Sequence, residues 1–323
     1  MSATAQSLEL APASSLPGLM SAAEETANAT VVGGETTPIV SGNVTLQQRQ
    51  ENCKSTLHLP WGPIEQCRRA IIGSAAGAVA LAGSATWYTK GFSSHLRVTN
   101  EHWFGRDTYS GGIDKLSHAF SFYAGTRLLH KALVWSGTEK EEALQLSLVT
   151  NLATGLAIEV FDGLSRKPYG FSKEDLISDA AGAGLGYLLE KYPRLDELLA
   201  YRMMYRPAGK KKFNPIDNYE GQTFLLSLKL AGVTPMSPSN PLRYLELAVG
   251  YGAKGYKGDY AGATDSGSHQ RSIYIGVMLN MNEVLRRTVF ARNAKPTTTQ
   301  KVTEGIFDYV QLPGTLLSHK NNF

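Results

Sequence analysis

The sequence predicts a mainly α fold with a β part, in which a helical bundle is followed by a small antiparallel sheet. Residues 61–205 hold helix-length apolar segments separated by Gly and Pro. From Tyr219 onward the pattern changes to short β-type runs. Residues 1–60 are largely polar and show no sustained period. We therefore expect a flexible leader over 1–60, a helical bundle over 61–205 and a β-rich region over 206–323.

Composition and motifs exclude several functional classes. The net charge of +4 on 323 residues is too small and too dispersed for a nucleic-acid-binding surface. The chain contains no phosphate-binding loop, nucleophile elbow or paired-histidine zinc helix. The run Gly182–Gly186 falls inside a predicted helix and does not follow a strand, so it is not a dinucleotide fingerprint. We predict no cofactor-binding residues beyond the metal candidates below.

The two cysteines and the first residues bear on the compartment. Cys53 and Cys67 would form one disulfide if the chain is exported, and two unpaired thiols are the alternative. The start has no apolar signal segment. Ala3-Thr4-Ala5 nevertheless has the pattern of a signal cleavage site, so these residues are interpreted either as a signal remnant or as an ordinary Ala-rich start.

The first predicted helix contains twenty uncharged residues, Ala70–Thr89. Basic residues precede it and Trp87-Tyr88 end it, as at membrane interfaces. Its many small residues equally suit a buried helix in a soluble bundle. We expect membrane association.

Three further helices are predicted over Asp114–Trp135, Glu139–Phe161 and Lys173–Tyr192. Ser172 followed by Asp175 is a variant of the capping box and marks the start of the last helix. The longest uncharged segment among them, Ala143–Ile158, is shorter than a membrane span, so we expect none of them to cross a bilayer.

The end of the bundle is predicted to be basic. A short helix after Pro193 would end in Tyr201–Arg206, and Lys210-Lys211-Lys212 follow. A solvated loop is the preferred interpretation, and contact with anionic lipid head groups is the alternative.

The β-rich region is predicted from three runs with partial alternation: Thr223–Leu230, Tyr244–Tyr251 and Ser272–Leu279. A helix over Asn282–Arg292 and an extended tail over Gly305–Phe323 complete the chain.

Polar residues recur on the predicted buried faces of the helices. They form three pairs at helical spacing: Asp114 with His118, Glu159 with Asp162, and Asp175 with Asp179. If consecutive helices are antiparallel, these pairs converge at one end of the bundle. Small residues at Ser178, Gly182 and Gly186 would let a neighbouring helix approach closely.

One histidine among several carboxylates suits either a divalent metal or acid–base chemistry. The metal candidates are Asp114, His118, Glu159 and Asp175, and the catalytic candidates add Asp162 and Asp179. A buried ion-pair and helix-cap network would explain the same residues, because crowded carboxylates need neutralisation. Lys115, Arg166 and Lys167 are available for it. We favour this network over the metal.

Several motifs resemble the YfiM-like family of bacterial cell-envelope proteins, which is related to VanZ-like membrane proteins. Asp114-Lys115-Leu116-Ser117-His118-Ala119 resembles the opening Asp-Lys-x-x-His of that family. Further matching runs are Glu159–Gly163, Gly170–Leu176, Gly182 with Gly186, and, beyond residues 68–192, the runs 219–223, 249–255 and 271–275 with Asn280. Asp179 stands where the family usually has Asn.

The resemblance implies a cell-envelope protein, periplasmic or outer-membrane-associated, without an established reaction. We expect a membrane-associated, non-enzymatic structural or accessory role with membrane lipid as partner and no nucleic acid. The alternative is a metal- or acid/base-dependent enzyme acting on a lipid or cell-wall precursor. A permeation accessory is a third hypothesis, since ionisable residues within membranes often line pathways.

Overall fold

The structure is a computed structural model that describes residues 63–323 apart from 107, 167–169, 208–214, 216–217, 234–235, 238, 257–268 and 294. The described residues lie within one compact unit, Val44–Phe323. The expected leader over residues 1–60 and the run Lys210-Lys211-Lys212 lie outside the described residues.

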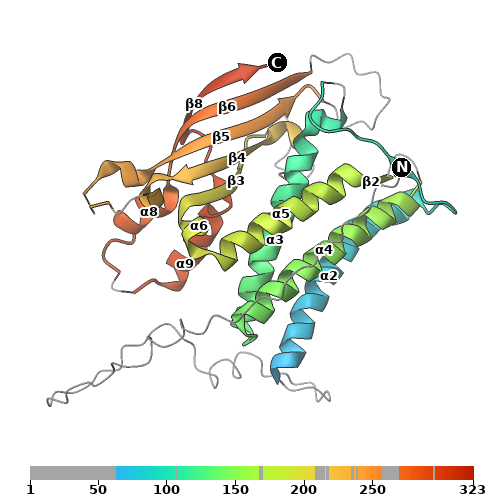
Figure 1. Cartoon of the computed structure of the whole chain (residues 1–323), viewed down its shortest axis with the longest axis horizontal. Helices are drawn as coiled ribbons and strands as arrows, with labels where there is room; N and C mark the ends of the chain where they lie inside the picture. The colour runs from blue at the N-terminus through green and yellow to red at the C-terminus, as the bar shows by residue number, and fades with distance from the viewer. Residues whose placement is uncertain are drawn as a thin grey trace, which may run out of the picture. The chain divides into compact units, whose positions relative to one another are not determined.

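Four long helices form the first part of the described chain (Figure 1): α2 (Pro63–Lys90), α3 (Ile113–Trp135), α4 (Lys140–Leu164) and α5 (Lys173–Lys191). All four predicted helices are present, and the last three begin and end within a few residues of the predicted positions. The central helix α3 packs against α2, α4 and α5. A 3₁₀ turn, η1 (Tyr109–Gly112), leads into it, and the short strands β1 (Val98–Thr99) and β2 (Phe171–Ser172) pair in parallel.

Small residues set the distance between α3 and α5. A Cβ atom added at Gly182 would lie 1.9 Å from the Ala119 carbonyl oxygen, and one at Gly186 would lie 2.7 Å from that of Tyr123. Both positions therefore admit glycine only, because the obstacle is backbone. The predicted small-residue contact is confirmed, and its partner is α3.

The second part is a six-stranded sheet with strand order β7-β3-β4-β5-β6-β8. Its strands are β3 (Leu199–Tyr205), β4 (Gln222–Lys229), β5 (Leu245–Lys254), β6 (Gln270–Leu279), β7 (Val310–Gln311) and β8 (Leu316–Asn322). Neighbours are antiparallel except β3 and β7. The predicted class, mainly α with a β part, is confirmed, with a larger sheet than the three predicted strands.

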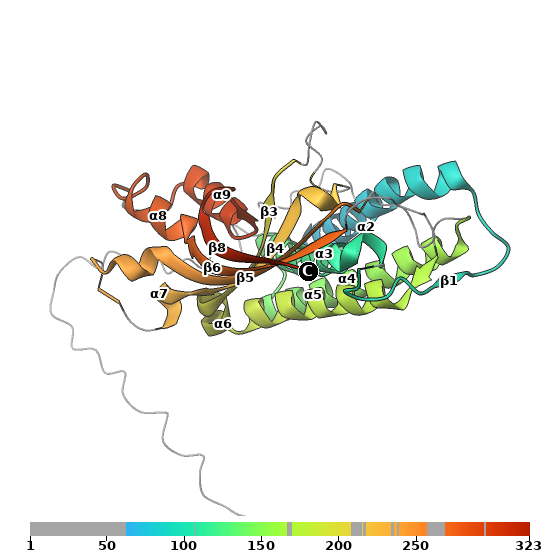
Figure 2. The same ribbon diagram turned by 90° about the horizontal axis from the view of Figure 1, so that it is seen from above.

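Short helical elements connect and flank the sheet. They are α6 (Pro193–Leu198), η2 (Tyr219–Gly221), α7 (Leu230–Val233), η3 (Pro241–Tyr244), α8 (Met281–Arg287) and α9 (Thr298–Phe307). Seen from above, the strands run between α5 and α6 on one side and α9 on the other (Figure 2).

One prediction near the start of this region was wrong. Tyr201–Arg206 was predicted to end a helix, but Leu199–Tyr205 forms strand β3, with alternate side chains on opposite faces of the sheet. Arg202 is consequently not part of an exposed basic patch but is buried in an ion pair with Glu246. The tail over Gly305–Phe323 was predicted to be extended, and it contains β7 and β8; α9, which was not predicted, ends within its first residues, at Phe307.

Aromatic side chains join the sheet to the bundle. On the face of the sheet toward α3, the ring centroid of Tyr201 lies 5.6 Å from that of Tyr123 and 5.7 Å from that of Phe120. Phe224 lies 5.5 Å from Phe120 in the same cluster. Edge-to-face and tilted pairs of this kind add to the apolar burial. The sheet thus fixes α3, which carries His118.

One helix among the described residues, α4, is long and apolar enough to cross a membrane. Its apolar stretch was predicted to be too short, but a single charged residue, Glu159, interrupts it near its end, and the apolar pattern continues beyond Ile158. The membrane association of Ala70–Thr89 stays a prediction, because side chains 85–90 lie outside the described residues. Cys67 is disulfide-bonded, as expected of an exported chain. Cys53 lies outside the described residues.

Candidate functional site

The predicted polar residues of α3, α4 and α5 converge at one end of the bundle. They divide into two groups, in each of which the potential ligand atoms lie within 4.8 Å of one another. The first group consists of His118, Glu159 and Asp179. The second consists of Glu101, Asp114 and Asp175.

Lys115 neutralises the second group. Its buried ammonium donates to Asp114 Oδ2 at 2.7 Å, to Asp175 Oδ1 at 2.7 Å and to the Glu101 carboxylate. The predicted role of Lys115 is thereby confirmed. Arg166 does not take part, because its Nε donates to the carbonyl oxygen of Phe92.

The three carboxyl groups of the second group differ in the direction of their pKa shifts. Burial raises the pKa of Glu101 to about 7, and the charge of Asp175 adds to the shift. Burial raises the pKa of Asp114 despite the neighbouring Lys115. The pKa of Asp175 is lowered, because the charges of His118 and Lys115 outweigh the effect of its burial. Lys115 thus offsets the charge of this group, while Asp114 Oδ1 is buried without a hydrogen-bond partner among the described residues.

The start of α5 positions the first group. Ser172 is the N-cap, as predicted, and its Oγ accepts from the backbone N–H of Asp175 at 3.2 Å. The Ser172 backbone N–H donates to Glu159 Oε2 at 2.7 Å, so the end of α4 is tied to the start of α5. One turn further along α5, Asp179 faces α3.

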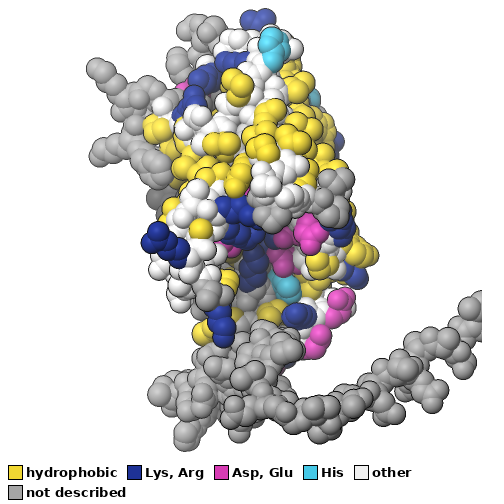
Figure 3. All heavy atoms as spheres, turned by 90° about the vertical axis from the view of Figure 1, so that its left-hand side faces the viewer, with side chains coloured by type: hydrophobic (Ala, Val, Ile, Leu, Met, Phe, Trp, Pro, Cys, Tyr) yellow, Lys and Arg dark blue, Asp and Glu magenta, His cyan; other side chains and the backbone are white. Residues whose placement is uncertain are grey.

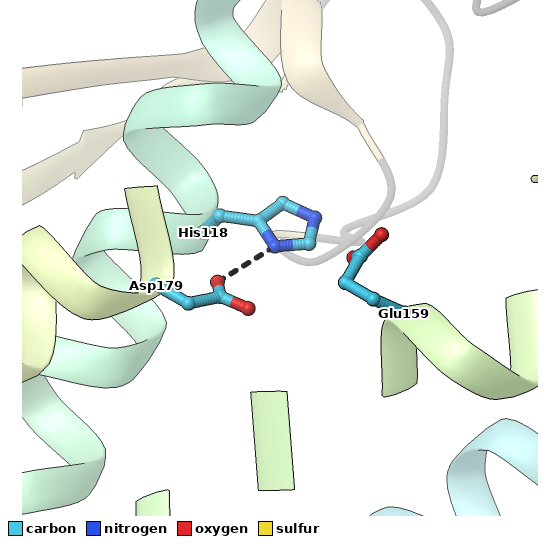
Figure 4. Close-up of side chains that lie close together, drawn as sticks. All are labelled: His118, Glu159 and Asp179. Carbon is cyan, nitrogen blue, oxygen red and sulfur yellow. Dashed lines mark hydrogen bonds and ion pairs between the residues drawn. The ribbon is translucent and has the colours of Figure 1, made fainter. Parts of the chain in front are cut away.

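His118 lies between the carboxylates of Asp179 and Glu159, as Figure 4 shows. Its Nδ1–H donates to Asp179 Oδ1 at 2.9 Å, which places Nε2 at 3.9 Å from Asp175 Oδ1. The side chain of His118 is 26% exposed, whereas that of Asp179 is 1% exposed. The imidazole therefore connects a buried carboxylate to the solvent-accessible edge of the site.

Asp179 has one carboxylate oxygen without a partner. Its Oδ2 is buried and accepts no hydrogen bond from any residue that the structure describes. A Cβ added at Gly155 would lie 2.8 Å from this atom and 3.0 Å from Phe122, so the glycine leaves room beside it. Leaving a buried acceptor unpaired is costly. A bound cation, a proton or a water molecule would satisfy it.

The proton affinities in the first group are shifted upward. Burial lowers the pKa of His118, but its hydrogen bond to Asp179 and the charge of Asp175 raise it to about 10 overall. Burial raises the pKa of Glu159 to about 8, against the hydrogen bond from Ser172. Burial raises that of Asp179 too. Near pH 7 His118 is therefore cationic and Glu159 protonated, and both protons are exchangeable for a metal ion.

Sequence reasoning misplaced or missed three residues of this region. Asp162 belongs to neither group, although its charge adds to the raised pKa of Glu159. Glu101 was missed because it lies in a loop, where no periodicity marks a buried carboxylate. Gly155 was missed because its role depends on α5 passing beside it. Lys167 lies outside the described residues.

A comparison with known protein families agrees with the predicted location in the cell envelope. Residues 100–191 match the profile of a family described as a predicted periplasmic lipoprotein, DUF2279. The matched segment contains α3, α4, α5 and every residue of both groups. No curated protein and no solved structure matches the chain. The predicted location in the cell envelope is confirmed by this similarity.

Proposed function

We propose that this envelope protein is membrane-associated, has a structural or accessory role, and holds one divalent cation between His118, Glu159 and Asp179. The observation that carries the cation is that Asp179, whose Oδ2 is buried and unpaired, offers a carboxylate oxygen within 4.8 Å of the ligand atoms of His118 and Glu159. Imidazole and carboxylate ligands together suit Zn²⁺, Mn²⁺ and Fe²⁺. A cation would displace the proton shared by His118 and Asp179, and it would offset the repulsion between the carboxylates.

Metal binding by the purified chain tests this part of the proposal. The chain is first stripped of metal with a chelator, then equilibrated with Zn²⁺ or Mn²⁺ and dialysed. We expect it to retain about one equivalent of the ion, as measured by elemental analysis. Glu159→Gln and Asp179→Asn remove a ligand charge with little change of shape and should lose the metal. Asp162→Asn is the matched control, because Asp162 lies outside both groups.

Exposed apolar side chains on the bundle support membrane association. Val149 and Leu156 on α4 are 62% and 49% exposed, and Leu81 on α2 is 75% exposed. Residues 149 and 156 are two turns apart and so share a face of α4. Exposed apolar side chains that share a helix face are typical of membrane or protein contacts.

Co-flotation with anionic phospholipid vesicles tests the association. The double variant Val149→Glu, Leu156→Glu should reduce the bound fraction at least about tenfold, since each side chain contributes roughly 1.5–3 kcal/mol when buried. Val302→Glu on α9 is the matched control, because Val302 is also exposed, at 58%. If Val249→Glu, at an exposed position of the sheet, caused the same loss by itself, the membrane contact would lie on the sheet and not on α4.

The finer assignment to the YfiM-like and VanZ-related proteins is also part of this proposal. Its support is that three of its motifs, at Asp114–Ala119, Glu159–Gly163 and Gly170–Leu176, lie inside the segment that matches the periplasmic family. The further runs after residue 219 lie outside that segment.

One observation favours the enzymatic alternative on a lipid. A cavity of about 460 Å³ between α2, α3 and α4 is lined mainly by apolar side chains, among them Ile71, Phe122 and Leu129. Phe122 follows His118 by one turn on the same face of α3. An acyl chain in this cavity would bring a polar head group toward His118. Mass spectrometry of vesicle lipids incubated with the wild type and with His118→Ala would reveal a product that depends on His118.

A further inference from the structure

A polar pocket of about 350 Å³ lies away from the His118 site, where α6, α7 and α8 meet the ends of β3 and β4. Figure 3 shows a side of the molecule on which basic and acidic side chains gather around a hollow. The residues on which the pocket's chemistry depends are Asp196, Arg202, Lys229, Asn282, Glu283 and Asp308.

The acidic groups of this pocket already have partners. Asp196 pairs with Arg127 at 2.8 Å. Glu283 pairs with Arg243 at 2.5 Å and with Arg287 at 2.8 Å. Asp308 Oδ1 accepts from Asn282 Nδ2 at 2.8 Å. The carboxylates therefore do not need a cation from solution.

Two cationic donors have unused capacity. Both Nη atoms of Arg202 donate to Glu246, at 2.5 and 3.0 Å, whereas its Nε–H is buried without a partner among the described residues. The Arg202 side chain is only 2% exposed. The side chain of Lys229 makes no hydrogen bond or ion pair with any described residue.

The sheet brings these donors to one face. Lys229 is the cross-strand partner of Glu246, and Leu225 on the same strand is that of Arg202. Cross-strand partners share a face, and so do residues at even spacing along a strand, so Arg202, Lys229 and Glu246 lie on the same side. On the other side of the pocket, Asn282 Oδ1 is a buried acceptor without a partner in the described chain.

We propose that this pocket binds a small oxyanion, a phosphate or carboxylate group, through Arg202 Nε and Lys229 Nζ. Charge-assisted hydrogen bonds to an oxyanion would satisfy both donors. A hydroxyl on the bound group would satisfy Asn282 Oδ1. Burial lowers the pKa of Lys229, and a bound anion would counteract this effect by favouring its charged form. The inference does not depend on the proposed metal or membrane contacts.

Calorimetric titration of the purified full chain with inorganic phosphate and, separately, with acetate tests the proposal. Sodium chloride at equal ionic strength is the reference. We expect saturable binding of at least one of the two oxyanions and none of chloride. Saturation with phosphate or with acetate identifies which of the two oxyanion groups the pocket prefers. Absence of saturable binding in both arms would overturn the proposal without any variant.

Three variants then locate the binding. Lys229→Met should weaken it by roughly tenfold or more, because a hydrogen bond to a charged group is lost. Lys229→Arg keeps the charge and should stay within about threefold of the wild type. Lys301→Met, at an exposed position of α9, is the control. Unchanged affinity in a folded Lys229→Met protein would also overturn the proposal.

Discussion

The backbone of Ala119 and the Cα of Gly182 are in such close contact that a Cβ at position 182 would lie 1.9 Å from the Ala119 carbonyl oxygen. Ala119 follows His118, and Gly182 lies one turn after Asp179. The close approach of α3 and α5 at these two residues therefore determines the distance at which His118 meets Asp179.

The first prediction concerns this contact. Gly182→Ala should destabilise the chain by about 3 kcal/mol, because the obstacle is backbone and cannot rotate away. Gly184→Ala is a matched control on the same helix, with no atom within 4 Å of the added Cβ. It should stabilise by about 0.5–1 kcal/mol through helix propensity. Urea unfolding measures both, and equal effects would refute the role of the contact.

The second prediction concerns Lys115. Replacing it with Met would leave Asp114, Asp175 and Glu101 without their shared cation. Removing one partner of a buried ion pair typically costs about 3–5 kcal/mol, and denaturant unfolding should show a loss of this size. Lys173→Met, whose side chain is 66% exposed, should change stability by less than about 0.5 kcal/mol. A loss below about 1 kcal/mol for Lys115→Met would contradict the neutralising role.

The third prediction concerns pH. The folded-state pKa of Glu159 is about 8 against an ordinary value of 4.5, and that of His118 is about 10 against 6.5. Between the ordinary and the folded-state pKa of each group, the folded state holds a proton that the unfolded state has released. These pH ranges are 4.5 to about 8 for Glu159 and 6.5 to about 10 for His118. Stability should therefore fall as pH rises from about 5 toward 10. Glu159→Gln should flatten the curve between pH 5 and 8, whereas the exposed Glu197→Gln should not.

The fourth prediction concerns the pH dependence of the proposed cation. Because the ligands His118 and Glu159 are protonated near pH 7, a metal ion must displace their protons. The apparent affinity for Zn²⁺ should therefore rise with pH between about 6.5 and 9. Competition with a chelator of known affinity at each pH measures it. A pH-independent affinity would indicate that the ion binds elsewhere.

The sequence predicted the helices of the bundle because their signals are local. Ser172 with Asp175 marks a helix start through its own hydrogen bond, and the apolar period extends over many turns. The convergence of His118 with Glu159 was predictable from spacing and antiparallel order. That the polar residues separate into two groups was not, because it depends on which carboxylates the Lys115 ammonium reaches across helices.

The sheet was harder to predict at its edges. Strand β3 contains Arg202, whose charge obscures the alternation and is tolerated only because Glu246, on a strand two places away, pairs with it. Strands β7 and β8 lie in the tail that was predicted to be extended, but their membership of the sheet depends on pairing with distant partners. Long-range pairing of this kind leaves little local signal.

The retention of metal by Asp179→Asn tests the central claim most directly, since Asp179 carries the unpaired oxygen. The wild type and Asp162→Asn should each bind about one equivalent of Zn²⁺ or Mn²⁺. Asp179→Asn should bind at least about tenfold more weakly while its circular dichroism spectrum is unchanged. Two results would contradict the account. One is a wild-type protein that binds neither Zn²⁺ nor Mn²⁺ after equilibration, and the other is an Asp179→Asn variant with wild-type affinity.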